Sequence, residues 1–145
     1  MTKKIKVFID SNIPMYAAGD EHPNRENSIQ LLKLISEGKI FGITSVEILQ
    51  EILYRYSLVN LLEKGLKIFD NFSHIIDEIL PINFQIIKDA REILEKNSKR
   101  NIYSRDAVHV ATMLYYGINY IGTFNKHFEI FRNIKYFNNA GNFYL

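Results

Sequence analysis

The sequence predicts an α/β fold with a mainly parallel central sheet. Short runs of β-branched and aromatic residues alternate with longer segments whose apolar residues keep helical spacing. Two of the short runs stop abruptly at polar residues, as is typical of the carboxyl edge of a parallel sheet. No internal repeat or low-complexity linker interrupts the 145 residues. Because this length suffices for one ordinary core, we expect a single domain over residues 1–145.

The composition narrows the classes of function. Lys and Arg number 18 and Asp and Glu 16, giving a formal net charge of +2, so a nucleic acid would have to be bound by a local basic patch. The chain has no cysteine, which excludes thiolate zinc sites and cysteine nucleophiles and leaves oxygen and imidazole groups as metal ligands. No apolar run approaches the roughly 20 residues of a spanning helix. We therefore expect a soluble, cytoplasmic protein with no membrane partner.

The first half of the chain predicts two strands and four helices. The strands are expected at residues 5–9 and 41–43. Helices are expected over residues 13–18, from Ile29 to a stop at Gly38, over Val46 to Leu53 behind a Thr44 or Ser45 cap, and over 58–72. The apolar side of the last helix is predicted to hold Leu58, Leu61, Leu62, Leu66 and Phe69. Such a helix offers a surface for a homodimer.

The second half continues the alternation. A short strand is expected among Ile75, Ile76, Ile79 and Leu80, before Pro81, although its periodicity is ambiguous. A helix at 83–97, a polar loop at 96–101, a helix capped by Ser104 and running through Tyr116, and a strand at 119–123 follow. The inward residues of the two helices are predicted to be Ile86, Ile87, Ala90, Ile93 and Leu94, then Ala107, Val108, Ala111 and Leu114.

Four polar residues are candidates for one cleft. Asp10 and Asn125 each follow a predicted strand, and the carboxyl ends of parallel strands share one rim. Asp106 lies in the first turn of its helix, where the helix dipole favours a carboxylate. Glu51 projects from a helix that is entered from another strand end. If the strands are neighbours, these four side chains converge.

A cluster of carboxylates indicates metal chemistry. Like charges in one cleft repel each other unless a cation offsets them or their pKa values rise. Mg²⁺ and Mn²⁺ prefer carboxylate and water oxygens as ligands. Such an ion lowers the pKa of bound water and neutralises charge on a phosphodiester under attack. The residues therefore predict metal-assisted hydrolysis of a phosphate ester.

Four segments, in this order along the chain, resemble the motifs of the PIN-domain family. The first runs from Phe8 to Asn12 and resembles the strand that delivers the first acidic residue. The others run from Thr44 to Leu53, from Ser104 to Ala111 and from Ile121 to Phe128. Each motif alone is weak, whereas the ordered set covers essentially the whole chain. The resemblance implies a three-layer α/β/α fold and a Mg²⁺- or Mn²⁺-dependent endoribonuclease, similar to VapC-type toxins, with RNA as substrate and an antitoxin protein as partner.

The resemblance also assigns roles to individual residues. Asp10 and Asp106 would be metal ligands, Glu51 the second acid, and Asn12 and Thr123 supporting hydrogen-bonding residues. Asn125 stands where the family often has Asp, so it offers an amide oxygen without a negative charge, and a second metal ion would be held more weakly. Glu47 is the alternative to Glu51, since both lie near the expected place.

Basic residues near these motifs are candidates for binding RNA phosphates: Lys99, Arg100, Arg105 and Lys126. Each functional interpretation has a purely structural alternative. The basic residues could belong to a solvated loop, and Glu51 could form an i, i+4 ion pair with Arg55. His109 is expected to be packed or hydrogen-bonded rather than a ligand. His22, His74 and His127 are expected at the surface.

Two other functions remain as alternatives at this stage. One is a catalytically impaired PIN-like module that binds RNA or protein, which the neutral Asn125 favours. The other is a phosphatase that forms a phospho-enzyme at Asp10, which the neutral Asn12 disfavours.

Overall fold

The computed structural model describes residues 4–139 and 141 and contains one parallel sheet at its centre. Its strands follow the order β3-β2-β1-β4-β5, and each pairs in parallel with its neighbours. Their bounds are β1 Lys6–Ile9, β2 Phe41–Ser45, β3 Glu78–Leu80, β4 Tyr120–Gly122 and β5 Lys135–Phe137. The mainly parallel sheet predicted from the sequence is confirmed.

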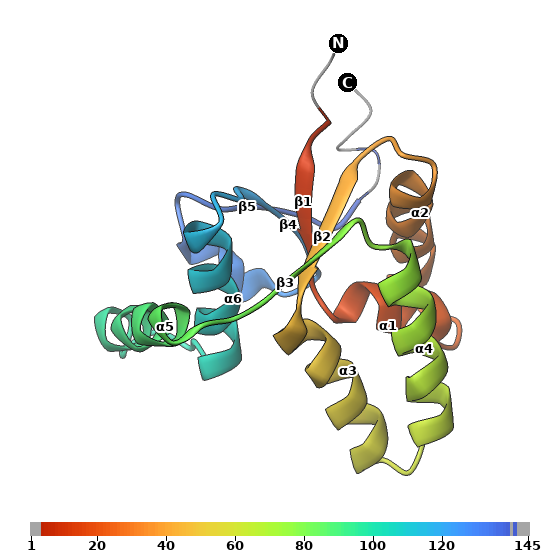
Figure 1. Cartoon of the computed structure of the whole chain (residues 1–145), viewed down its shortest axis with the longest axis horizontal. Helices are drawn as coiled ribbons and strands as arrows, with labels where there is room; N and C mark the ends of the chain where they lie inside the picture. Colours follow the sequence, from red (N-terminus) through yellow and green to blue (C-terminus); the bar gives the residue numbers. More distant parts are fainter. Residues whose placement is uncertain (1–3, 140, 142–145) are drawn as a thin grey trace.

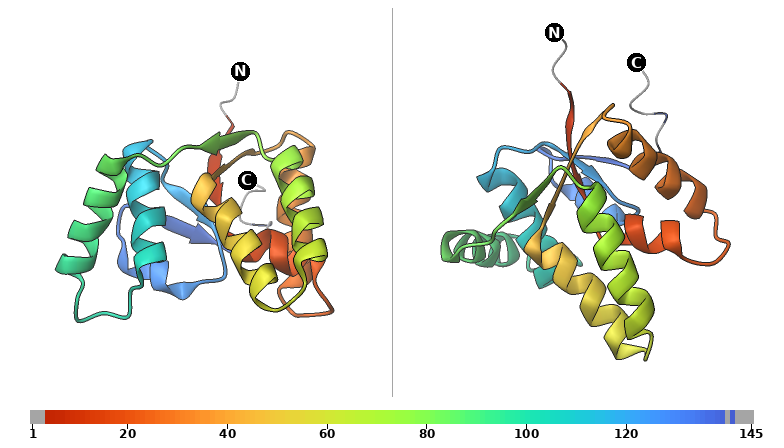
Figure 2. Two further views of the ribbon diagram at one scale, coloured as in Figure 1. Left: turned by 60° about the horizontal axis from the view of Figure 1, so that its bottom comes forward. Right: turned by 45° about the vertical axis from the view of Figure 1, so that its right-hand side comes forward.

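Helices cover both faces of the sheet. They are α1 Asn12–Ala18, α2 Arg25–Ser36, α3 Val46–Leu58, α4 Leu62–Ile75, α5 Phe84–Lys96 and α6 Ser104–Tyr115, with a short 3₁₀ helix η1 at Lys126–Ile130. Figure 1 shows α1, α2 and α4 on one side of the sheet and α5 and α6 on the other. The two turned views show the same separation (Figure 2). The expected three-layer α/β/α arrangement is therefore present.

The central strand β1 positions the start of the site. Val7, Phe8 and Ile9 are all fully buried, as expected for a strand covered by helices on both faces. The backbone N–H of Asp10 donates to the carbonyl of Gly122 at 3.0 Å, so the ends of β1 and β4 stay side by side. Residues that follow these two strands are thus brought to one edge of the sheet.

Two glycines allow α2 to lie directly on the sheet. A Cβ added at Gly42 in β2 would stand 2.7 Å from Ile35 Cδ1, and one at Gly122 in β4 would stand 2.8 Å from Leu31 Cδ2. A larger residue at either position would force the facing side chain of α2 to move.

Helix α3 continues β2 beyond the carboxyl edge of the sheet. Ser45 caps it by accepting a hydrogen bond from the N–H of Ile48 at 3.3 Å, which confirms the second of the two predicted caps. Helix α4 packs against α3, and a Cβ at Gly65 would come within 2.5 Å of Tyr56 Cβ. The two helices form a hairpin that extends past the sheet (Figure 1).

The helix expected over 58–72 is present as α4, with different bounds. Leu58 ends α3, and α4 begins only at Leu62. The leucines assigned to its apolar side are exposed by 46–67%: Leu58, Leu61, Leu62 and Leu66. The buried residues are instead Gly65, Ile68 and Phe72. Apolar spacing identified a helix here but not the face that α3 covers.

Further corrections concern the second half. The strand expected among Ile75, Ile76, Ile79 and Leu80 is shorter than predicted. Ile75 still belongs to α4, and β3 begins only at Glu78. Ser104 is the first helical residue of α6 rather than its cap. Ile87 and Leu114, predicted inward, are 45% and 47% exposed. Strand β5 was not predicted. Among the described residues, no helix is long and apolar enough to cross a membrane.

Candidate active site

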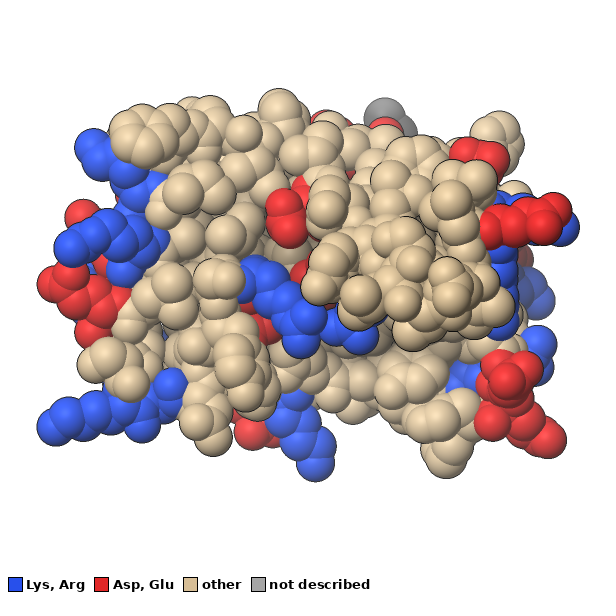
Figure 3. All heavy atoms as spheres, turned by 90° about the horizontal axis from the view of Figure 1, so that it is seen from below, with Lys and Arg blue, Asp and Glu red and all other residues tan. Residues whose placement is uncertain are grey.

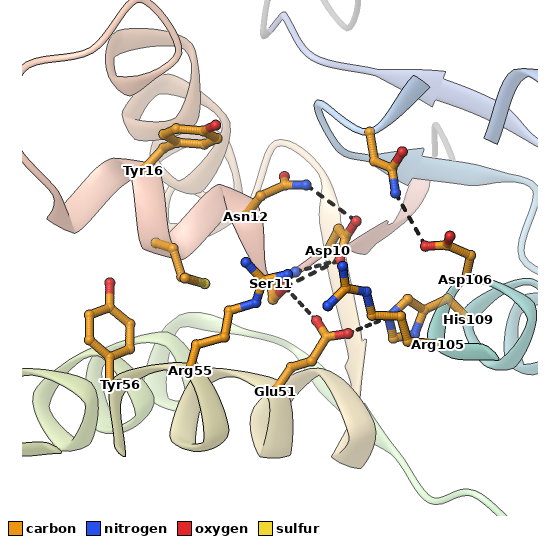
Figure 4. A pocket seen from close by; sticks show the side chains of 12 residues that line it. Asp10, Ser11, Asn12, Tyr16, Glu51, Arg55, Tyr56, Arg105, Asp106 and His109 are labelled. Atoms are coloured by element: carbon orange, nitrogen blue, oxygen red, sulfur yellow. Dashed lines mark hydrogen bonds and ion pairs between the residues drawn. The ribbon is translucent and has the colours of Figure 1, made fainter. Parts of the chain in front are cut away.

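A pocket of about 300 Å³ opens at the carboxyl ends of the strands. Figure 3 shows acidic side chains in a hollow near the middle of this face, with basic side chains beside them. Three of the predicted acids line the pocket together with the predicted amide (Figure 4). The full lining is Asp10, Ser11, Asn12, Met15, Tyr16, Glu51, Arg55, Tyr56, Arg105, Asp106, His109 and Asn125.

Asp10 is buried and held on both carboxylate oxygens. Oδ1 accepts from the backbone N–H of Ser11 at 2.7 Å. Oδ2 accepts from the Thr123 hydroxyl at 2.7 Å and from Asn12 Nδ2 at 3.3 Å. Asn12 Nδ2 also donates to Thr123 Oγ1 at 3.0 Å. The structure thus brings Asn12 and Thr123 against Asp10, as expected of supporting residues.

Glu51 reaches the same pocket from α3 and is 6% exposed. Its Oε2 accepts from the Ser11 hydroxyl at 2.5 Å, and its Oε1 lies 3.3 Å from Nε2 of His109. The alternative i, i+4 ion pair with Arg55 is not formed. Glu47 is half-buried one turn earlier and does not line the pocket. The geometry therefore favours Glu51 as the second acid.

Asp106 is buried at the start of α6 and faces Asn125. Its Oδ1 accepts from Asn125 Nδ2 at 3.2 Å, and its Oδ2 accepts from the Tyr103 N–H at 3.3 Å. The amide oxygen of Asn125 accepts from the His127 N–H at 2.9 Å. Asn125 therefore presents its NH₂ group, and not its oxygen, to the nearest carboxylate.

His109 lies closer to the candidate metal ligands than the sequence reasoning expected. It was expected to be packed or hydrogen-bonded, and its contact with Glu51 agrees with that. Yet ligand atoms of Asp10, Glu51 and His109 all lie within 4.8 Å of one another, a spacing that one metal ion could bridge. Its position three residues after Asp106 was the available signal, because residues i and i+3 share a helix face. His127, expected at the surface, is half-buried, with Nδ1 3.5 Å from Asp106 Oδ2.

Burial and charge shift the pKa values of these groups in different directions. Burial raises the pKa of Asp10, against the opposing charge of His109 and the Thr123 hydrogen bond. Burial would also raise the pKa of Glu51, but the hydrogen bond and charge of His109, with the Ser11 hydrogen bond and the charge of Arg105, together outweigh it and lower that pKa. The pKa of His109 is raised because the hydrogen bond to Glu51 and the nearby carboxylates outweigh the effect of its burial. The cluster thus holds excess negative charge that a cation would stabilise.

The donor set fits a divalent ion. Asp10 and Glu51 supply carboxylate oxygens, and His109 supplies an imidazole nitrogen. The Nδ1 atom of His109 is buried and has no hydrogen-bond partner. Mg²⁺ and Mn²⁺ both accept carboxylate oxygens, and Mn²⁺ also accepts imidazole. Asp106 faces the same pocket but lies outside this tight group.

The basic residues divide into two groups. Arg105 lines the pocket, as does Arg55, which the sequence reasoning had not assigned to RNA. Figure 4 shows both side chains extending toward the carboxylates, Arg55 from α3 and Arg105 from α6. The other predicted phosphate contacts are exposed and do not line the pocket: Lys99, Arg100 and Lys126.

Comparison with known proteins matches this architecture. The PIN domain family model matches residues 7–133, which contain the complete pocket lining and extend from β1 through β4 but leave out β5. The chain belongs to the PIN-domain family. The resemblance inferred from the four motifs is confirmed, and the acidic pocket lies where this PIN domain carries those motifs.

The relatives of this PIN domain include ribonucleases. The chain is 33% identical over 129 residues to ribonuclease VapC13 of Mycobacterium tuberculosis, covering 89% of this chain and 97% of the relative. It is 28% identical to ribonuclease VapC6 of Methanocaldococcus jannaschii, covering 85% and 90%. Among solved structures, M. tuberculosis VapC20, a sarcin-ricin loop cleaving toxin, matches with a TM-score of 0.71 at 15% identity, covering 86% of this chain and 93% of that one. VapBC2 from Rickettsia felis, bound to promoter DNA, also gives 0.71, at 19% identity with 92% and 98% covered.

Proposed function

We propose that this PIN domain, as one domain over residues 1–145, is a metal-dependent endoribonuclease that hydrolyses RNA phosphodiesters. The observation that carries the proposal is the convergence of Asp10, Glu51 and His109 within 4.8 Å in a pocket also lined by Asp106. The name of VapC13, a ribonuclease at 33% identity, supports the same activity.

The residues of the pocket have different roles in the proposed reaction. Asp10 and Glu51 would hold a Mg²⁺ or Mn²⁺ ion, with His109 beside them and Asp106 at the far side of the pocket. The ion, when bound, supplies Lewis acidity to the phosphodiester and lowers the pKa of water. Thr123 and Asn12 fix the Asp10 carboxylate in one orientation. Arg55 and Arg105 provide positive charge for the phosphate that the carboxylates alone would repel.

The experiment that tests this function is cleavage of single-stranded RNA by purified protein with Mg²⁺ or Mn²⁺. The expected result is that Asp10→Asn and Asp106→Asn each abolish cleavage, because each removes a negative charge from the carboxylates that line the pocket. Glu92→Gln, an exposed carboxylate on α5, is the control and should cleave normally. Cleavage that survives both pocket substitutions would remove the site assignment.

A binding module without catalysis is the second candidate, and Asn125 favours it. Its NH₂ group occupies the side of Asp106 where a carboxylate could hold a further cation. Asn125→Asp separates the two candidates. Faster cleavage in this variant supports an enzyme with a weakened ion site, whereas RNA binding without cleavage in both forms supports the binding module.

We further propose that the chain is the toxin of a toxin–antitoxin pair, located in the cytoplasm, with an antitoxin protein as partner and a homodimer as its own assembly. The VapBC complexes among the structures of the same fold motivate this. Co-expression with the product of the neighbouring reading frame tests it. Copurification with loss of RNA cleavage is expected, and cleavage unaffected by that product would contradict the proposal.

A further inference from the structure

A second hollow of about 520 Å³ adjoins the acidic pocket and has a different character. Its lining is apolar and aromatic apart from two arginines, and it is formed mainly by the second half of α3. Four residues line both hollows: Met15, Arg55, Tyr56 and Arg105. The two hollows are therefore continuous, with the arginines at their junction. We call the second one the α3 groove.

The side chains of the α3 groove are exposed although they are apolar. Tyr54 is 54% exposed, Leu58 67% and Val59 59%. A contiguous apolar patch of this kind beside a polar pocket is typical of a ligand surface. Among the described residues, neither Arg55 nor Arg105 forms an ion pair. Both guanidinium groups are consequently available to an anion.

We propose that the α3 groove binds one unpaired nucleotide of the RNA, with its base against Tyr54 and its phosphate on Arg55 and Arg105. This rests on the proposed ribonuclease function. A single-stranded RNA presents a flat base next to a phosphate, then the next phosphate along the strand. The α3 groove offers an aromatic surface for the base, and the two arginines beside it offer positive charge for the adjoining phosphate. The acidic pocket then lies where the next phosphate along the strand would be cleaved. Aromatic stacking tolerates any base, so the contact supplies affinity for unpaired RNA rather than a sequence code.

The test is a binding measurement in EDTA, so that no cleavage occurs. Fluorescence polarisation of a labelled single-stranded RNA gives the affinity of the wild type and its variants. Tyr54→Ala should weaken binding about 10-fold, the range for loss of one stacked base, and Tyr54→Phe should restore it. The matched control is Phe84→Ala, which removes an aromatic residue on α5 that is more exposed than Tyr54, 76% against 54%, and should bind as the wild type does.

The arginine arm separates charge from stacking. Arg55→Ala should reduce the slope of log affinity against log salt by about 0.7, the value for one phosphate contact on a single strand. Tyr54→Ala should leave that slope unchanged, because it removes no charge. Arg132→Ala, outside both hollows, is the control for net charge and should keep the wild-type slope.

A second probe isolates the base. An oligomer of abasic ribose phosphates keeps every phosphate and lacks every base. Tyr54→Ala should bind it as tightly as the wild type does, while Arg55→Ala should bind it more weakly. Equal losses on both probes in Tyr54→Ala would overturn the stacking assignment.

The outcomes also distinguish this proposal from the proposed function. If the wild type binds RNA through the groove but never cleaves, the nucleotide site stands and the ribonuclease proposal fails. If the wild type cleaves and none of the groove variants changes affinity or KM, the ribonuclease stands and the nucleotide site is overturned. In that case a protein partner would be the remaining occupant of the groove.

Discussion

The acidic pocket and the α3–α4 end of the molecule lie next to each other but differ in the side chains that they bury. In the pocket, Asp10, Glu51 and Asp106 are almost completely buried, and each is fixed by at least two hydrogen bonds. At the α3–α4 end, Leu58 and Leu62 face the solvent. In these two regions, the side chains at the carboxyl edge of the sheet are buried although they are charged, and those at the α3–α4 end are exposed although they are apolar. Polarity alone therefore does not decide which side chains are enclosed.

Burying carboxylates and exposing leucines each cost free energy in the isolated chain. Buried carboxylates lose hydration, which is why burial raises the pKa of Asp10. Exposed leucines leave apolar surface in water. Each cost would be relieved by a ligand, a cation in the first region and an apolar or aromatic group in the second. The following predictions test how far the two regions differ.

After the loss of cleavage expected for Asp10→Asn and Asp106→Asn, the largest effect is expected from Glu51→Gln. The change removes the charge that faces His109 and Asp10 while keeping the shape of the side chain, so kcat should fall about 10²- to 10³-fold. Glu47→Gln, on the same helix and outside the pocket, should change kcat less than about threefold. Single-turnover cleavage assays measure both. The reverse pattern would assign the second acid to Glu47.

A smaller effect is expected from Thr123→Val. The hydroxyl donates to Asp10 and accepts from Asn12, so its loss should weaken Mn²⁺ binding by about 10- to 100-fold, as found for residues that orient metal ligands. Isothermal titration calorimetry measures the affinity. Thr112→Val, a buried hydroxyl that donates to the carbonyl of Val108, is the control. Equal affinities in the two variants would show that Thr123 does not position a ligand.

The metal affinity should depend on pH with a defined sign. The pKa values of Asp10 and His109 are both raised, from 3.8 and 6.5, so each group retains a proton to a higher pH than usual. A bound cation must displace these protons, and its affinity should therefore fall as the pH is lowered, by up to about tenfold per pH unit for each proton. The loss should begin above pH 6.5, where His109 starts to protonate. Calorimetry in buffers of different ionisation enthalpy counts the protons released, and an affinity that rises at lower pH would contradict the sign.

The smallest effect is expected at the α3–α4 end. Leu62→Ser should change the free energy of unfolding by less than about 0.5 kcal/mol, because the side chain is already half exposed. Ile52→Ala, at a fully buried position of α3, should cost about 2–5 kcal/mol. Urea denaturation followed by circular dichroism compares them. A large loss in Leu62→Ser would mean that this end is covered in solution, for instance by a second copy.

Much of the site could be predicted from sequence because its residues lie next to strands. Asp10 follows a run of β-branched and aromatic residues, and parallel strands bring their carboxyl ends to one rim. Asp106 lies in the first turn of a helix with clear apolar spacing. The family motifs added the order of these segments. Local patterns, one topological rule and the motifs were therefore sufficient for Asp10 and Asp106, whereas the choice between Glu51 and Glu47 needed the geometry of the pocket.

The tertiary structure alone decided which side of a helix faces inward and which atoms meet. The spacing of Leu58, Leu62 and Leu66 predicted the apolar side of a helix, yet α3 and α4 bury their shared side around Gly65 and leave these leucines exposed. The contact between His109 and Glu51 joins residues 58 positions apart, and no local pattern records it. Short-range spacing determines the type of an element, whereas its burial and its partners depend on distant segments that approach only when the chain folds.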